Sequence, residues 1–280
     1  MSGDGFRIRN MRPDEIALAV DWAAKEGWNP GLADASCFGA ADTGGFFIGE
    51  YEGKPAATLS VVNYGERFAF LGLYIVRPDL RGRGFGLRIW KAGIAHAGAR
   101  TVGLDGVAGQ QENYRKSGFT FAYNNIRYGG VPAAWGAPQV AEPLPGVPFD
   151  LIEQSDAGVF PAERPEFLRA WIGAKGHTGR AVMRGGRLAG WGVIRPCQRG
   201  RKIGPLVADD RATAEAVFAA LVGGEGGEVF LDVPRPNREA AALAEAHGLA
   251  PVFETARMYT GPIRPVRLER VFGVTTFELG

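Results

Sequence analysis

Glycine and arginine alternate in Arg81-Gly82-Arg83-Gly84-Phe85-Gly86, which lies between an apolar segment and an amphipathic one. A glycine-rich turn from a strand into a helix points several backbone N–H groups in one direction. Glycine also lets the main chain approach an anion without a Cβ in the way. Arg81, Arg83 and Arg88 add positive charge. The spacing therefore predicts an anion site, with a phosphate group as the natural ligand.

This loop does not match the two common nucleotide motifs. A P-loop needs a Gly-Lys-Ser/Thr ending, and a dinucleotide fingerprint needs one more glycine at the proper spacing. We therefore expect neither a nucleoside triphosphate nor NAD. The alternative without function is a surface loop in which glycine forms turns and arginine aids solubility.

The segments around this loop predict the elements that hold it. Residues 68–76 form an apolar run typical of a buried strand, and apolar side chains recur at helical spacing over 87–97. Patterning and turn residues predict further strands at 6–9, 45–51, 56–64, 101–107 and 119–128 and helices at 13–26 and 111–116. Because helices interrupt a mostly antiparallel set of strands, we expect an α+β fold.

The second half of the chain repeats the first in weaker form. Three segments recur in the same order: VGLDGV at 102–107 as VFLDVP at 229–234, YRKSGF at 114–119 as AEAHGL at 244–249, and IRYGG at 126–130 as RMYTGP at 257–262. Their order and nearly constant offset indicate duplication of one domain.

A proline-rich stretch separates the two halves. Prolines at 132, 138, 143, 145 and 148 favour an extended connector over a helix or a central strand. We therefore predict a first domain at 1–131, a linker at 132–148 and a second domain at 149–280.

Composition narrows the classes of function. The 280 residues carry a net charge of +2 and are 46% hydrophobic, as in a soluble globular protein. So small a charge does not favour a nucleic-acid or membrane surface as partner. Cys37 and Cys197 are far apart, which supports neither a disulfide framework nor a metal site. Without an apolar run long enough to span a bilayer, the chain is expected to be cytoplasmic.

The loop and a second motif together resemble a known family. Arg81, Gly84 and Gly86 match the Arg/Gln-x-x-Gly-x-Gly/Ala loop of the GNAT superfamily of acyl-CoA N-acyltransferases. NYRKSGF at 113–119 resembles that family's Tyr-x-x-x-Gly-Phe ending, about 30 residues downstream. The likeness covers 1–130 and, more weakly, 150–262. The chain thus resembles bacterial tandem-GNAT proteins with a degenerate second domain, each domain a mixed, mostly antiparallel sheet flanked by helices.

This resemblance implies acetyl-CoA as cosubstrate, bound where the strands at 68–76 and 101–107 splay apart. Gly72, within the first strand, is the expected start of the splay. The pantetheine would pair with Leu73, Tyr74, Ile75 and Val76, and the pyrophosphate would be held at Arg81, Gly82, Arg83, Gly84, Phe85, Gly86 and Leu87.

The resemblance also implies the catalytic residues. An amine would attack the thioester directly, with Tyr114 as general acid toward the sulfur of coenzyme A. Glu26 and Asp105 are candidate bases, and Trp28 and Asn29 are candidate pocket residues. The loop at 26–31 is equally typical of a helix end packed on the core, and an Asp at a strand end commonly caps the next turn.

The second half lacks the anion loop. Its equivalent segment, 204–213, has no glycine after Gly204 and carries Asp209 and Asp210, which disfavours phosphate. We expect this half to wall the acceptor pocket, with 271–279 completing a sheet or an interdomain seam. The predicted function is N-acetyl transfer to a primary amine of a small molecule or a lysine-like acceptor. The alternative is a catalytically silent acyl-CoA-binding regulatory module.

Overall fold

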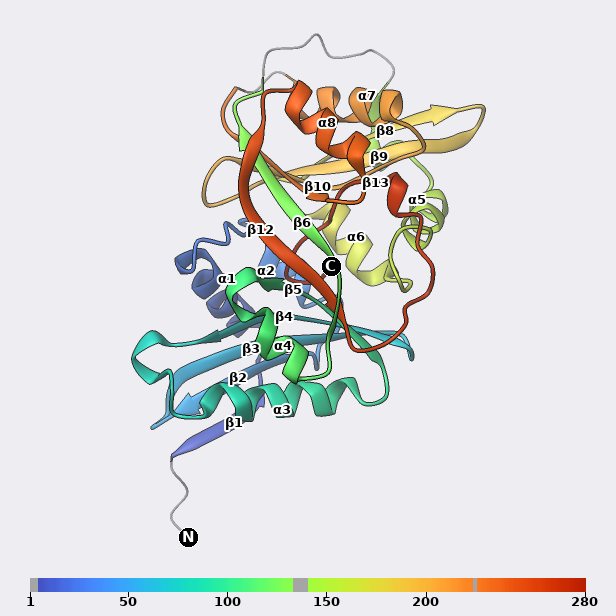
Figure 1. The fold of residues 1–280 in the computed structure, drawn as a ribbon. Coiled ribbons are helices and arrows are strands. Elements are labelled where there is room, and N and C mark those ends of the chain that lie inside the picture. The colour runs from blue at the N-terminus through green and yellow to red at the C-terminus, as the bar shows by residue number, and fades with distance from the viewer. Residues whose placement is uncertain (1–4, 133–140, 224–225) are drawn as a thin grey trace.

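The computed structural model describes residues 5–132, 141–223 and 226–280 (Figure 1). The first half contains β1 (Phe6–Asn10), α1 (Ile16–Lys25), α2 (Asp34–Phe38), β2 (Phe46–Tyr51), β3 (Lys54–Tyr64), β4 (Phe68–Val76), α3 (Phe85–Ala97), β5 (Thr101–Val107), α4 (Gln111–Lys116) and β6 (Thr120–Gly130). The strands predicted at 68–76 and 101–107 and the helix at 111–116 have the predicted bounds.

The second half repeats much of this order. It contains β7 (Glu142–Pro143), α5 (Phe149–Ala157), α6 (Pro165–Gly173), β8 (Thr178–Arg184), β9 (Arg187–Pro196), β10 (Arg201–Ala208), α7 (Arg211–Val222), β11 (Val229–Pro234), α8 (Arg238–Ala246), β12 (Ala250–Tyr259) and β13 (Val271–Gly273). The series β4-α3-β5-α4-β6 thus has its counterpart in β10-α7-β11-α8-β12. This confirms the predicted α+β fold with two related halves.

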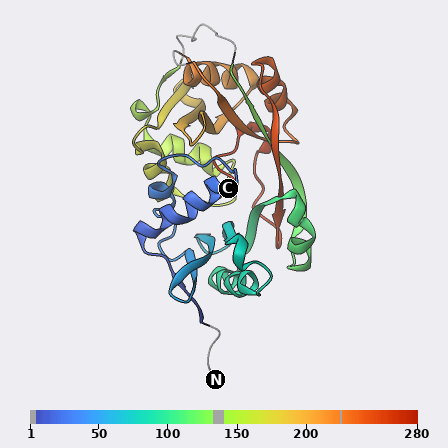
Figure 2. The same ribbon diagram turned by 90° about the vertical axis from the view of Figure 1, so that its left-hand side faces the viewer.

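The two halves exchange their last strands. The sheet runs in the order β1-β2-β3-β4-β5-β12-β6-β11-β10-β9-β8-β7, so β12 of the second half pairs with β5 of the first. In return β6 pairs with β11. Figures 1 and 2 show β6 and β12 side by side along the molecule. Residues 133–140 of the predicted linker lie outside the described residues. The domain bounds 1–131 and 149–280 remain a proposal.

Two buried ion pairs recur at equivalent places in this exchange. Arg257 on β12 lies opposite Asp105 on β5, with Nε and Nη2 donating to the two carboxylate oxygens at 2.8 and 2.7 Å. Arg127 on β6 lies opposite Asp232 on β11, with the same atoms at 2.6 and 2.8 Å. All four side chains are buried. Each pair therefore joins an aspartate of one half to an arginine of the other.

Each half also contains a pair of parallel strands that diverge. The ladder between β4 and β5 ends at Leu71 and Leu104, and the ladder between β10 and β11 ends at Ile203 and Leu231. In the second half β13 fills the opening, because it pairs with β10 beyond that point. The expectation of strand structure in the 271–279 tail is confirmed for β13.

A shared core fixes the halves on one another. One buried cluster contains Phe38 and Leu73 of the first half and Trp171 and Trp191 of the second. Cys37 lies in this cluster, where burial raises the pKa of its thiol to about 11. Its thiol is therefore neutral at physiological pH, as expected of an apolar filler. Among the helices that the structure describes, none has the length and apolar character needed to cross a membrane.

Candidate active site

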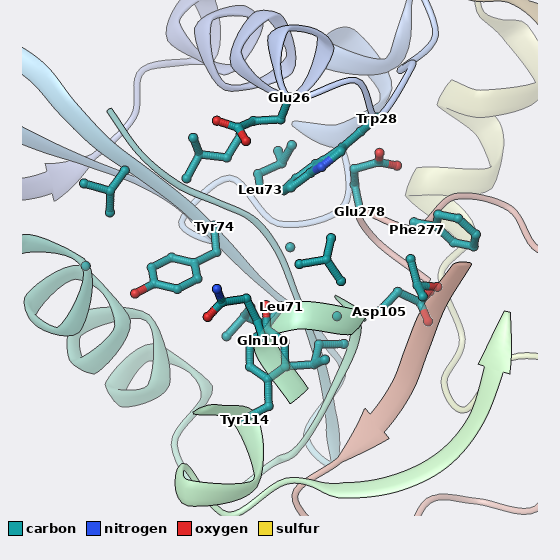
Figure 3. Close-up of a pocket in the computed structure, with 18 of the residues that line it drawn as sticks. Glu26, Trp28, Leu71, Leu73, Tyr74, Asp105, Gln110, Tyr114, Phe277 and Glu278 are labelled. Carbon is teal, nitrogen blue, oxygen red and sulfur yellow. The ribbon is translucent and has the colours of Figure 1, made fainter. Parts of the chain in front are cut away.

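A cavity of about 530 Å³ opens between β4 and β5 where their ladder ends (Figure 3). Its walls come from β4, the glycine loop and the start of α3, the end of β5, α4, β12 and the C-terminal tail. Of the residues predicted to hold the cofactor, ten line this cavity: Leu73, Tyr74, Ile75, Val76, Arg81, Gly82, Gly84, Phe85, Gly86 and Leu87.

A bulge in β4 creates the opening. Ser60 of β3 pairs with Gly72 and Thr58 pairs with Ile75, so β4 has one extra residue between these pairs. Leu73 takes up the irregularity with a left-handed φ of 48°, and its carbonyl oxygen accepts a hydrogen bond from Thr58 Oγ1 at 2.8 Å. The splay therefore starts at Gly72, as predicted, and the residue with the strained backbone is Leu73.

Gly72 also has a role in packing. A Cβ at this position would lie 2.0 Å from the carbonyl oxygen of Glu278. The backbone of the C-terminal tail therefore packs directly on β4, and only glycine leaves room for it. The tail thereby reaches the end of the cavity where the two strands part.

The glycine loop has the conformation that an anion site needs. Gly82 and Gly84 have φ values of 80° and 81°, which residues other than glycine rarely adopt. Gly84 is the N-cap of α3 and provides no side-chain cap, so the first N–H groups of α3 remain available to a ligand. At position 86 a glycine is favoured by packing, because a Cβ there would lie 2.5 Å from Tyr74 Oη.

Only one of the three loop arginines lines the cavity. Arg81 does so, and it donates from Nε to the Val76 carbonyl oxygen at 2.9 Å. The guanidinium of Arg83 lies 4.3 Å from the ring centroid of Tyr51, and that of Arg88 lies 4.7 Å from the ring centroid of Phe6. Arg83 thus makes a cation–π contact with Tyr51 and is not among the lining residues, and its binding of the cofactor stays a prediction.

Tyr114 lies where the predicted general acid should be. It lines the cavity from α4 and packs in a stacked arrangement on Trp90, with ring centroids 5.9 Å apart. Its ring packs over β5 at Gly106, where a Cβ would lie 2.3 Å from Tyr114 Cε2. Burial raises the pKa of Tyr114 to about 12, so the hydroxyl stays protonated and able to donate at neutral pH. Gln110, which precedes it, also lines the cavity.

The two predicted bases both line the cavity but already have partners. Arg81 Nη2 donates to Glu26 Oε1 at 2.6 Å, which holds this carboxylate at the end of the cavity formed by the glycine loop. Asp105 binds Arg257 through both oxygens and also accepts from Asn125 Nδ2 at 2.7 Å. Because the Asp232–Arg127 pair repeats this geometry away from the cavity, the position of Asp105 is accounted for by the strand exchange.

The two predicted pocket residues lie in different places. Trp28 lines the cavity, but Asn29 is not among its lining residues. The side chain of Asn29 binds the main chain of Arg199 in the second half, donating to its carbonyl oxygen at 3.0 Å and accepting from its N–H at 2.9 Å. Asn29 thus joins the two halves, and its role as a pocket residue stays a prediction.

Comparison with known proteins accords with this geometry. The model of the acetyltransferase (GNAT) family matches residues 14–119, and that of an acetyltransferase (GNAT) domain matches residues 152–273. The holothin acyltransferase of Pseudoalteromonas sp. (strain SANK 73390) is 30% identical over 270 residues, which cover 95% of this chain and 92% of that protein. This chain belongs to the GNAT family of acyltransferases. It is an enzyme with two GNAT domains in tandem.

Solved structures share this GNAT fold. A candidate acetyltransferase from Pyrococcus horikoshii superposes with a TM-score of 0.85 at 20% identity, over 100% of this chain and 98% of that one. A tandem GNAT protein from the clavulanic acid biosynthesis pathway superposes with a TM-score of 0.61 at 16% identity, over 92% and 99% of the two chains. These likenesses concern the fold.

The second GNAT half supplies four cavity residues that the sequence did not single out. They are Phe253 and Thr255 on β12 and Phe277 and Glu278 in the tail. The exchange of β12 is what carries two of them to the first half. The sequence did contain a signal for Glu278, because it is the single charged residue in the apolar segment 271–279.

Proposed function

We propose that the first half transfers an acetyl group from acetyl-CoA to the primary amine of a small molecule. The observation that carries this proposal is the pairing of an uncapped helix start at one end of the cavity with a protonated tyrosine further in. A phosphate group needs the first feature, and a departing thiolate needs the second.

The donor would lie along β4. The N–H groups from Gly82 to Leu87 and the Arg81 guanidinium would hold the diphosphate, since these residues line the cavity and nothing stands within 4 Å of a Cβ built on Gly82 or Gly84. The pantetheine would follow the β4 edge that β5 leaves unpaired beyond Leu71. The thioester would then lie near the bulge at Leu73.

The chemistry needs no covalent enzyme intermediate. The amine nitrogen attacks the thioester carbon, the C–S bond breaks, and Tyr114 donates its hydroxyl proton to the leaving sulfur. Backbone N–H groups near the bulge would stabilise the developing oxyanion. Holding both substrates in one enclosed cavity supplies the favourable orientation.

Two observations support a small-molecule acceptor. The cavity end beyond the bulge is enclosed by Trp28, Phe253 and Phe277, which favours a compact, apolar substituent over a polyamine. The relative named holothin acyltransferase is 30% identical over almost the whole chain. This likeness to an acyltransferase also favours turnover over the alternative of a silent binding module.

Calorimetry with coenzyme A, together with thiol release from acetyl-CoA in the presence of primary amines, tests this proposal. We expect binding of coenzyme A to the wild-type protein and thiol release that depends on the added amine. A protein that binds no coenzyme A, or that releases no thiol with any amine, contradicts the proposal.

A further inference from the structure

We propose that Glu278, carried in by the C-terminal tail of the second half, binds the amino group of the acceptor and takes its proton. This inference rests on the function proposed above. Three carboxylates line the described part of the cavity, namely Glu26, Asp105 and Glu278. The sequence pointed to the first two, whereas the contacts favour the third.

The location of Glu278 fits the reacting end of the cavity. Its main chain packs on Gly72, the residue just before the bulge at Leu73. Glu26 is bound to Arg81, which also contacts the Val76 carbonyl oxygen, so Glu26 lies toward the diphosphate end. Both oxygens of Asp105 are engaged by Arg257. The contacts thus leave Glu278 as the carboxylate beside the bulge that neither Arg81 nor Arg257 engages.

The tail holds the Glu278 carboxylate in one orientation. Glu278 is only 3% exposed, and its own N–H donates to Thr276 Oγ1 at 2.9 Å. The Thr276 hydroxyl in turn donates to Glu278 Oε2. This turn of the tail fixes the side chain before a substrate arrives, and such preorganisation is what a proton acceptor needs.

Cationic side chains from three strands interact electrostatically with Glu278. The cations of Arg127 on β6, Arg195 on β9 and Lys202 on β10 all act on it. Two of them are paired with other carboxylates, Arg127 with Asp232 and Arg195 with Asp34. Lys202 Nζ donates to the Asn29 carbonyl oxygen at 2.8 Å. A carboxylate at the cavity wall can accept a hydrogen bond from the N–H of a neutral amine and then take that proton as the nitrogen attacks.

The neighbours of Glu278 indicate the rest of the acceptor. Figure 3 shows its carboxylate beside the Trp28 ring. Phe277 and Phe253 also belong to the cavity wall, with ring centroids 6.4 Å apart. Thr255 Oγ1 lies buried in this wall and has no hydrogen-bond partner among the described residues. These residues favour a flat, apolar primary amine with one further polar group. The flat part would pack on the aromatic rings and the polar group would bind Thr255 Oγ1.

The proposed step balances. The amine gives one proton to Glu278 as its nitrogen bonds to the acyl carbon, and the electron pair of the broken C–S bond goes to sulfur. Tyr114 donates a proton to that sulfur. Glu278 then releases its proton to solvent, and Tyr114 regains its hydroxyl proton from solvent.

The test is Glu278→Gln, measured with acetyl-CoA and with tryptamine or tyramine as acceptor. We expect kcat to fall about 100-fold, as for loss of a general base, with the Kd for coenzyme A within about twofold of wild type. In the wild type, protonation of Glu278 should lower kcat/KM as the pH falls. In Glu278→Gln this part of the pH dependence should disappear. Glu269→Gln, an exposed glutamate earlier in the same C-terminal segment, should leave all three quantities unchanged.

A second variant separates chemistry from folding. In Glu278→Ala, added formate should restore part of the lost kcat, because formate can occupy the vacated space and accept the proton. A Glu278→Gln variant that keeps wild-type kcat and pH dependence, or a folded Glu278→Ala variant that formate does not rescue, overturns this inference alone. A wild-type protein that neither acetylates nor binds these amines contradicts the proposed acceptor class, and this inference with it.

Discussion

The two halves contain the same diverging strands, but only one opening forms a large cavity. Beyond Leu71 and Leu104 the first half has a cavity of about 530 Å³. At the equivalent place in the second half, β13 pairs with β10. A Cβ at Gly204 there would lie 2.4 Å from the Thr275 carbonyl oxygen. The tail thus fills the second opening and then reaches Gly72 at the edge of the first.

The helices that follow these strands, α3 and α7, differ in their N-caps. The N-cap of α3 is Gly84, which leaves the first N–H groups to a ligand. The N-cap of α7 is Asp210, whose Oδ1 accepts from Thr213 N at 2.7 Å. Where the protein supplies its own carboxylate, an outside anion finds neither free donors nor a favourable charge. The comparison shows that a shared topology leaves ligand binding to a few cap and tail residues.

The largest expected effect concerns the paired aspartates. Asp105→Asn should lower the free energy of unfolding by about 3–5 kcal/mol, because it leaves the buried Arg257 charge uncompensated. Asp232→Asn should do the same through Arg127. Denaturant unfolding measures both. A large cost for one variant only would break the equivalence of the two exchanged strands.

Tyr114→Phe should lower kcat by about 100-fold while leaving the Kd for coenzyme A unchanged, because only the donated proton is lost. Thiol release and calorimetry give the two quantities. Tyr128→Phe, on β6 and outside the cavity lining, is the matched control. Unchanged turnover in Tyr114→Phe would remove this hydroxyl from the mechanism.

Gly84→Val should weaken coenzyme A binding by about tenfold to a hundredfold, since a left-handed φ costs about 1–3 kcal/mol for a side chain and the loop would shift. Gly53→Val is matched to it, because Gly53 has a φ of 74° in a hairpin away from the cavity. It should lose stability without losing affinity. Equal affinities in calorimetry would contradict the role of the α3 start.

The smallest effect is expected at the capped helix. Asp210→Ala should cost about 1 kcal/mol of unfolding free energy and leave coenzyme A affinity unchanged. Hydrogen bonds from Thr213 lower the pKa of Asp210 from 3.8 to about 2. The cap therefore stabilises the fold fully above pH 3.8, and its contribution is lost as the pH falls toward 2. A Tm difference from wild type that persists at pH 2 would contradict this account.

Local patterns predicted much of the fold and one end of the site. The strands at 68–76 and 101–107 follow from continuous apolar runs. The turn before α3 follows from Gly82 and Gly84, whose left-handed backbone favours glycine. The contacts of Arg83 and Asn29 could not be predicted, for one reason. Their directions depend on Tyr51 and Arg199, which are distant in sequence.

The sequence by itself determined the elements and the conformation of the glycine loop, because each depends on residues within about one turn or one strand of each other. It also showed that the elements repeat. Tertiary structure alone decided which opening stays empty, which carboxylate is already paired and which residues of the second half reach the first. These outcomes depend on strand exchange and on the path of the C-terminal tail, and both are set by packing between segments that lie far apart in the chain.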